Sequence, residues 1–302
     1  MIENILDVTK TEMPDPEVIE ESQGVIKFVL KNPATLLRSE SVVIPMRSYH
    51  NERWHTLCVS SQMGCSRGCS FCATGKLNLK GNLSTGDIVQ QLASADSILM
   101  QKEELGGIRN IVFMGMGEPF DNWSAVREAI GIFNKKYSFP CSSITVSTSG
   151  HIDGIHHFAE EGPRGTGLAV SLNSANNELR SELMPINKIW PLSELHEALK
   201  LVPISSRRKF LVEYVMLEGI NDSITHADEV IKWCKGLPCI VNLIKFNSIE
   251  GSKFKPSKDE AIIAFQEHIR ANKVFCKIRR SFGSEISAAC GQLGGEAIKQ
   301  KR

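Results

Sequence analysis

From residue 58 onward, short apolar segments alternate with segments whose apolar residues recur every three or four positions. The periodic segments predict helices, the clearest beginning at Ser84, where Asp87 completes a capping box, with others over Ser124–Phe133, Leu192–Leu201, Ala227–Cys234 and Asp259–Asn272. The short, β-branched segments predict strands at Ile111–Met114, Ser143–Val146, Leu168–Leu172, Phe210–Val215, Ile240–Ile244 and Phe275–Ile278. This alternation is typical of βα units around a parallel sheet, and about six units favour an α/β fold of the (β/α)6 barrel type, full or partial, over a doubly wound sheet.

The chain before Cys58 has a different pattern. It contains strand-like segments at Val25–Leu30 and Val42–Ile44 and little that predicts a helix. We therefore expect residues 1–57 to form a small β extension that caps a core barrel of residues 58–302.

Small and polar residues directly follow five of the predicted strands. In a barrel of parallel strands, the loops after the strands gather at one mouth, where active sites lie. The five loops expected there are Gly115–Pro119, Ser147–Gly150, Asn173–Ser174, Met216–Asn221 and Lys245–Asn247.

Composition narrows the class of protein. Of the 302 residues, 42% are hydrophobic and 23% charged, and hydrophobic segments recur throughout, which excludes intrinsic disorder. No run approaches the roughly 20 apolar residues of a membrane span. The acidic N-terminus lacks the basic and then apolar segments of a signal peptide, so we expect a cytoplasmic protein without a membrane partner.

The net charge of +1 gives no global attraction to a polyanion, so any nucleic acid must bind through local patches. Candidates are Arg207-Arg208-Lys209, Lys277 with Arg279 and Arg280, and the tail residues Lys299, Lys301 and Arg302.

Three of the nine cysteines crowd into one short segment. Cys65, Cys69 and Cys72 form C-x3-C-x2-C, which in a reducing compartment points to metal or catalysis. Three thiolates can hold three irons of a [4Fe–4S] cluster and leave the fourth open; the amino and carboxylate groups of S-adenosyl-L-methionine can chelate that iron, and an electron then cleaves the sulfonium to a radical. Zinc is the alternative, with His50 or His55 as the fourth ligand.

Longer motifs surround this segment. Leu57–Gln62, Met114–Pro119, Met184–Lys188 and Ala288–Leu293 resemble the RlmN/Cfr family of radical S-adenosylmethionine (SAM) RNA adenine methyltransferases, and the resemblance runs from about Val25 to about Leu293. It implies a partial (β/α)6 barrel. It also implies an RNA partner (rRNA, tRNA or both), an electron donor such as flavodoxin or ferredoxin, and a monomer.

The resemblance further implies a route to an adenine carbon that has no nucleophilic lone pair. Cys290 would accept a methyl group by displacement, and that group would then be joined to adenine through radical chemistry. Cys58 would release the product by forming a disulfide, after Glu40 had accepted a proton. The matching cofactor-binding positions are Gly117, Glu118, Ser147, Ser171, Leu172, Asn173 and Asn247, and the metal positions are Cys65, Cys69 and Cys72. The remaining cysteines, Cys141, Cys234, Cys239 and Cys276, are expected to be packing residues.

Three features depart from the family pattern. We expect the usual N-terminal accessory domain to be missing, Asn173 stands where His is usual, and Phe282 stands where Arg is usual. The leading function is methylation of adenosine carbon 2 in 23S rRNA or tRNA. Carbon-8 methylation of 23S rRNA, a radical SAM reaction on a non-RNA substrate and a non-catalytic RNA-binding module with a structural metal remain as alternatives.

Overall fold

The computed structural model describes residues 15–204, 208–279 and 282–295. Its main feature is one curved ten-stranded sheet in the order β1-β2-β3-β4-β7-β8-β9-β10-β11-β12. The strands are β1 (Val18–Ser22), β2 (Val25–Lys31), β3 (Arg38–Arg47), β4 (Arg53–Cys58), β7 (Ile108–Phe113), β8 (Ile144–Thr148), β9 (Gly167–Ser171), β10 (Phe210–Met216), β11 (Cys239–Lys245) and β12 (Phe275–Arg279). The short β5 (Gln62–Met63) and β6 (Gly81–Asn82) form a separate pair.

The sheet changes character at β4. The strands β1 to β4 pair antiparallel, whereas each pair from β4–β7 to β11–β12 is parallel. The predicted fold class, an α/β partial barrel with an N-terminal β extension, is confirmed. The sequence pattern does not predict β4, which continues across residue 57 and joins the extension to the parallel strands in one sheet. The proposed domain boundary at that residue stays a prediction.

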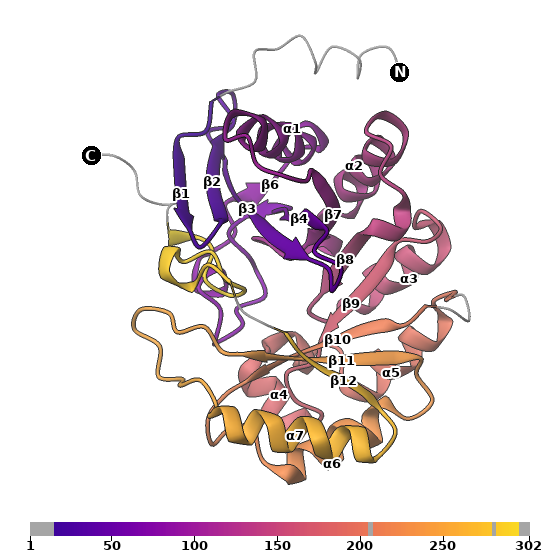
Figure 1. The fold of residues 1–302 in the computed structure, drawn as a ribbon. Coiled ribbons are helices and arrows are strands. Elements are labelled where there is room, and N and C mark those ends of the chain that lie inside the picture. The colour runs from indigo at the N-terminus through magenta and orange to yellow at the C-terminus, as the bar shows by residue number, and fades with distance from the viewer. Residues whose placement is uncertain (1–14, 205–207, 280–281, 296–302) are drawn as a thin grey trace.

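Helices connect the parallel strands and cover the outer side of the sheet (Figure 1). They are α1 (Thr85–Gln101), α2 (Trp123–Lys136), α3 (Ile152–Glu161), α4 (Asn177–Leu183), α5 (Leu192–Leu201), α6 (Ile224–Cys234) and α7 (Asp259–Ala271). The Ser84–Asp87 capping box is present at the start of α1. The sequence analysis did not predict α3 or α4. In α3, Gly154 weakens the helical pattern, but it is required because a Cβ there would lie 2.3 Å from the Phe120 side chain.

The chain after β12 returns across the sheet to its first strands. Ser22 on β1 donates a hydrogen bond of 2.6 Å to Glu285, and Ala288 and Leu293 pack in one small apolar cluster with Val25, Val42, Cys58 and Met116. In Figure 1 this yellow segment therefore lies beside β1 and β2 rather than beside β12 alone. No helix among the described residues is long and apolar enough to cross a membrane.

Candidate active site

Two adjoining cavities lie at the carboxyl ends of the parallel strands. The larger, about 510 Å³, has Cys58 and Cys290 in its wall, and we call it the thiol cavity. The smaller, about 170 Å³, contains Cys65, Cys69 and Cys72, and we call it the three-cysteine cavity. Met114, Ile244, Arg279 and Cys290 line both. The two cavities therefore adjoin at Cys290. Residues 284–295, which we call the Cys290 segment, are remote in sequence from residues 64–77, which we call the three-cysteine loop.

The three-cysteine cavity suits a cationic metal group. All three thiols are free, and burial raises the pKa of each, to about 12 for Cys65. Thiols of this kind become thiolates when a metal replaces the proton. Each iron of a cluster takes one thiolate, so the three sulfurs need not meet at one point.

The zinc alternative finds no support in this geometry. In the described part of the chain, no three His, Cys, Asp or Glu side chains converge on a shared position for one metal ion. His55 is buried on β4, where its Nδ1 pairs with the carbonyl of Gly106 at 2.7 Å, and His50 is exposed in the β3–β4 turn. Neither imidazole lines the three-cysteine cavity.

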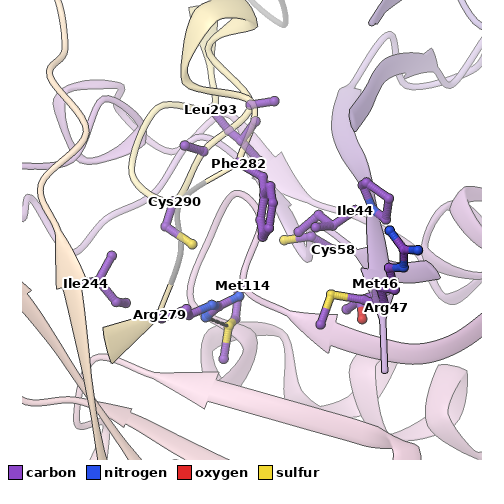
Figure 2. Close-up of a pocket in the computed structure, with 14 residues that line it drawn as sticks. Ile44, Met46, Arg47, Cys58, Met114, Ile244, Arg279, Phe282, Cys290 and Leu293 are labelled. Atoms are coloured by element: carbon purple, nitrogen blue, oxygen red, sulfur yellow. Dashed lines mark hydrogen bonds between the residues drawn. The ribbon is translucent and has the colours of Figure 1, made fainter. Parts of the chain in front are cut away.

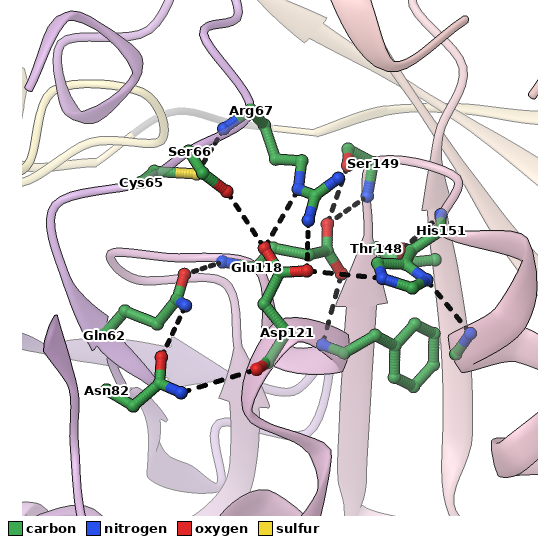
Figure 3. A network of polar contacts seen from close by, with 12 residues as sticks. Gln62, Cys65, Ser66, Arg67, Asn82, Glu118, Asp121, Thr148, Ser149 and His151 are labelled. Carbon is green, nitrogen blue, oxygen red and sulfur yellow. Dashed lines mark hydrogen bonds and ion pairs between the residues drawn. The ribbon is translucent and has the colours of Figure 1, made fainter. Parts of the chain in front are cut away.

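Asp121 anchors the three-cysteine loop to the loop after β7 (Figure 3). Its carboxylate accepts hydrogen bonds from Ser66 (3.1 Å) and from the guanidinium of Arg67, and it lies 3.3 Å from Nε2 of His151. Burial by itself would raise the pKa of Asp121, but the hydrogen bonds from His151, Arg67 and Ser66 outweigh it and hold the pKa well below its usual range. His151 also accepts the Gly154 amide at the start of α3, so loops after two strands meet here.

Gly117 and Glu118 form a tight turn against Gln62. Gly117 has a φ of +98°, and a Cβ there would lie 2.6 Å from the Gln62 side chain, so only glycine fits. The Glu118 amide donates to Oε1 of Gln62 (2.9 Å), and its carboxylate accepts the amide and hydroxyl of Ser149 (2.8 and 2.7 Å). Glu118 thus joins the loops after β7 and β8 (Figure 3).

Arg180 connects the loop after β8 with the end of β9 and the residue that follows it. Its side chain is fully buried and donates to the carbonyls of Ser149 (2.6 Å), Ser171 (3.1 Å) and Leu172 (3.0 Å) and to Oδ1 of Asn187 (2.9 Å). Burial lowers the pKa of Arg180 to about 10, so the guanidinium remains charged at neutral pH.

The predicted cofactor-binding residues separate into two groups. Gly117, Glu118, Ser147, Ser171 and Asn173 line the three-cysteine cavity, but Leu172 and Asn247 do not. The Leu172 side chain is buried in the main apolar core. Asn173, at a φ of +56°, accepts the Val215 amide (2.8 Å) and donates to the sulfur of Met184 (3.2 Å), so its amide holds neighbouring loops together.

The thiol cavity brings Cys58, Cys290 and Arg279 together (Figure 2). Cys58 ends β4, and burial together with the nearby Cys290 raises its pKa to about 12, against the opposing charge of Arg279. The pKa of Arg279 is raised, first by Cys290 and then by Glu213 and Cys58, although burial opposes this. Phe282 extends into the same cavity (Figure 2), where the family pattern has an arginine.

Glu40 and Asn247 lie just behind these cavities. Glu40 is fully buried on β3, and its Oε2 accepts the Gly294 amide at 2.9 Å. Asn247, which follows β11, donates through Nδ2 to the carbonyl of Cys290 at 3.2 Å. Both side chains therefore contact the Cys290 segment through its backbone.

The basic patches are only partly described. Lys209 lies 5.8 Å from the ring centre of Phe275, at the start of β12. Arg279 is half-buried and lines the two cavities. Arg207, Arg280, Lys299, Lys301 and Arg302 lie outside the described residues. Cys234, Cys239 and Cys276 are buried in the main core, as expected for packing residues, and Cys141 is partly exposed.

Sequence reasoning missed Arg180, Glu213 and Asp121 as organisers of the site. Glu213 interrupts the apolar strand β10, and Arg180 precedes the Met184–Lys188 motif by only a few residues. A charged residue in a buried strand is a signal that could have found Glu213. The sequence predicts Arg279 only as part of a basic patch. Its pairing with Glu213 depends on the parallel alignment of β10, β11 and β12, which the sequence does not show.

Comparison with known proteins agrees with this geometry. A model of the radical SAM superfamily matches residues 59–231, and fold and cavity together define a radical SAM protein. The probable dual-specificity RNA methyltransferase RlmN 1 of Protochlamydia amoebophila is 38% identical, with 100% of this chain and 82% of that protein covered. The dual-specificity RNA methyltransferase RlmN of Campylobacter jejuni (serotype O:23/36, strain 81-176) is 42% identical, with 93% and 81% covered.

A solved structure extends the agreement to three dimensions. The radical SAM methyltransferase from Sphaerobacter thermophilus superposes with a TM-score of 0.84 at 35% identity, and the match covers 95% of this chain and 84% of that chain. The chain belongs to the RlmN family of radical SAM methyltransferases. The family resemblance in the sequence is confirmed.

Proposed function

We propose that this protein methylates carbon 2 of adenosine in RNA, either 23S rRNA or tRNA, through a methyl group carried on Cys290. The observation that carries the proposal is the shared wall of the two cavities. Cys290 lines the three-cysteine cavity and also the thiol cavity that contains Cys58. A methyl group on its sulfur would therefore lie between the place where a radical is generated and the thiol that ends the reaction.

Cys65, Cys69 and Cys72 are the residues that would hold a [4Fe–4S] cluster, with S-adenosyl-L-methionine beside them. When bound, this pair supplies the methyl group for Cys290 and a radical that removes hydrogen from it. Gly117 and Glu118 line this cavity and would bring the loop after β7 against the methionine part, since a residue without a Cβ lets the backbone approach a ligand closely. Ser147, Ser171 and Asn173 line the same cavity and would contact the nucleoside part. Leu172 and Asn247 would support these contacts from behind.

The two thiol-cavity cysteines take complementary roles. Cys290 is partly exposed, which suits a thiol that must meet a cofactor and then a base, whereas Cys58 is buried and carries a high pKa. Cys58 would act last: its thiolate attacks the Cys290 sulfur and a disulfide forms. The bond from that sulfur to the product carbon breaks, its electron pair stays on the carbon, and the carbon takes up a proton to complete the methyl group. Two external electrons must reduce this disulfide before the next cycle.

Glu40 is proposed as the acceptor of the proton that leaves the adduct carbon. Its carboxylate is buried beside the Cys290 segment, as the hydrogen bond from Gly294 demonstrates. Its side chain does not line either cavity. The proton would therefore reach it only after a small shift of that segment.

The proposed partners are RNA and a one-electron donor such as flavodoxin or ferredoxin. We place the protein in the cytoplasm and expect it to act as a monomer. The apolar thiol cavity is large enough for a nucleobase, and Arg47 on its wall offers a contact for phosphate.

Nucleoside mass spectrometry tests the proposal. Purified protein, reconstituted anaerobically with iron and sulfide, is incubated with reductant, S-adenosylmethionine and total RNA, and the RNA is digested. We expect 2-methyladenosine, absent with the Cys290→Ala variant. Appearance of 8-methyladenosine instead would transfer the assignment to carbon 8. Formation of 5′-deoxyadenosine without any methyladenosine would exclude RNA methylation under these conditions.

A further inference from the structure

The segment that carries Cys290 is hydrogen-bonded directly to the three-cysteine loop. The amide of Ala73, next to Cys72, donates to the carbonyl of Gly291 at 2.7 Å. The hydroxyl of Thr74 donates to the carbonyl of Leu293 at 2.6 Å, in a buried position, although 219 residues separate the two in sequence. The first of these bonds joins the two residues that directly follow Cys72 and Cys290, so the two cysteines are held close to one another.

Close packing reinforces the contact. Gly294 has a φ of +120°, and a Cβ there would lie 2.4 Å from the Cδ1 atom of Leu77, which ends the same loop. Any other residue would be strained at this φ, and its Cβ would force the Leu77 side chain to move. Thr74 and Leu77 therefore contact consecutive residues of the Cys290 segment.

The Cys290 segment has little regular structure of its own. After β12 it contains only the 3-10 turn Ser284–Ile286 within the described residues. Besides the Ser22–Glu285 hydrogen bond and the apolar contacts of Ala288 and Leu293, its position depends on a few individual bonds. These are the bonds from Ala73 and Thr74, the bond from Gly294 to Glu40, and two on the β11 side, from Asn247 to the carbonyl of Cys290 and from Gln292 to the carbonyl of Ser248 (2.9 Å). The hydroxyl of Thr74 is the one side-chain donor in this set that comes from the three-cysteine loop.

We propose that Thr74 is a positioning residue for Cys290, and that its hydroxyl holds the Cys290 segment on the three-cysteine loop so that both are placed as one unit. This inference rests on the proposed function, in which Cys290 carries the methyl group. Without the hydroxyl, the buried Leu293 carbonyl has lost its donor, and the segment can regain one only by moving toward water. Such a movement would take the Cys290 sulfur away from the cavity that the three cysteines share.

Two substitutions separate the hydroxyl from the shape of the side chain. Thr74→Val keeps the shape and removes the donor, whereas Thr74→Ser keeps the donor and removes a methyl group. Thr166→Val is the matched control, because Thr166 is a buried threonine before β9 whose hydroxyl has no hydrogen-bond partner within the part of the chain that the structure describes. Gly294→Ala is a second disrupting variant, on the opposite side of the contact.

The first readout is amide hydrogen exchange of the full-length protein, followed on peptides that span residues 288–294. We expect exchange there to be about tenfold faster or more in Thr74→Val and Gly294→Ala, and close to wild type in Thr74→Ser and Thr166→Val. Unchanged exchange in Thr74→Val would overturn the proposal. This measurement needs neither RNA nor methyl transfer. It therefore tests whether the Thr74 hydroxyl holds the Cys290 segment in place even if the proposed function fails.

The second readout uses reconstituted protein and measures iron binding, 5′-deoxyadenosine formation and methylation of Cys290 separately. We expect Thr74→Val to bind iron and to form 5′-deoxyadenosine within a few-fold of wild type, while methylation of Cys290, read by peptide mass spectrometry, falls at least about tenfold and returns in Thr74→Ser. Equal loss of iron, cleavage and methylation in Thr74→Val would show that Thr74 only supports the loop, and would overturn the assignment. If wild-type protein never methylates Cys290, the proposed function fails, and the exchange result stands by itself.

Discussion

The guanidinium of Arg279 lies 3.7 Å from the carboxylate of Glu213, at the junction of the two cavities. Glu213 is in turn bonded to Asn242 (3.0 Å), and burial raises its pKa. Arg279 therefore supplies positive charge to a region that contains one buried carboxylate and two thiols.

Removal of this charge should make the Cys58 thiolate rarer. Because Arg279 opposes the rise of the Cys58 pKa to about 12, the pKa should rise further in Arg279→Met, and each added pKa unit reduces the thiolate fraction about tenfold. Alkylation of Cys58 by iodoacetamide at about pH 9, read by peptide mass spectrometry, should slow accordingly. Arg279→Lys keeps the charge and should react at nearly the wild-type rate.

The same comparison in a Glu213→Gln background removes the effect of an unpaired carboxylate. If Arg279→Met and Arg279→Lys alkylate equally fast in that background, the charge of Arg279 has no influence on Cys58.

Substitution of the two thiol-cavity cysteines should stop the reaction at different steps. Cys58→Ala still allows methylation of Cys290 and addition to the base, but no thiolate remains to release the adduct. A covalent protein–RNA species should accumulate in this variant, visible on a denaturing gel, with the link at Cys290 in nuclease-trimmed protein. Cys290→Ala and the double variant should show none. A crosslink in Cys290→Ala alone would exchange the two roles.

Loss of a single cluster ligand should lower the iron content. In Cys72→Ala one iron lacks its thiolate, so iron after anaerobic reconstitution should fall clearly below wild type and cleavage of S-adenosylmethionine should stop. Cys234→Ala, a buried cysteine in the main core, should keep its iron. Full iron in Cys72→Ala would contradict the assignment of the loop.

The ionised carboxylate of Asp121 should add to the free energy of unfolding, and this contribution should be lost at acid pH. Its pKa in the folded protein lies below the value of about 3.9 in an unfolded chain. The contribution is therefore complete above that value and is lost as the pH falls through the lower, folded-state pKa. In urea unfolding, the difference between wild type and Asp121→Asn should be constant above about pH 5 and shrink below about pH 4. A difference that grows with acid would have the wrong sign.

Arg180 should be essential for stability as well as for loop geometry. Arg180→Met removes the donor from four acceptors in buried or partly buried hydrogen bonds, so the free energy of unfolding should fall by about 3 kcal/mol or more, measured by urea denaturation. Arg180→Lys should recover only part of this, since an ammonium group cannot reach all four acceptors. The exposed Arg164→Lys should change stability by less than about 0.5 kcal/mol.

Local features of this protein were predictable because the chain itself enforces them. The spacing of Cys65, Cys69 and Cys72 places three thiols on one loop whatever the rest of the fold does. The Ser84–Asp87 capping box is likewise local, and it is present where the sequence predicts it. Each βα unit also has its own local pattern of a short apolar segment and a helical period. Most strands and helices are therefore predicted to within a few residues of their positions in the structure.

Other features depend on how distant segments align, and only the tertiary structure decided them. The sequence cannot show that the Leu172 side chain packs in the core while Ser171, which ends β9, lines the cavity, because a single step along an extended chain reverses the direction of a side chain. Likewise, β4 has a mixed pattern, and its position between β3 and β7 is set by pairing with both.

The meeting of Cys58, Arg279 and Cys290 is the clearest case. Each lies in a different part of the chain, and no periodicity links them. They share a cavity because the parallel strands bring their carboxyl ends to one rim and the segment after β12 returns to the first strands. There the Leu293 carbonyl also accepts a hydrogen bond from the Thr74 hydroxyl of the three-cysteine loop. The sequence alone determined which chemical groups this protein possesses. The register and curvature of the sheet determined which of them face one another, since distances between remote residues are set by packing and not by the chain that connects them.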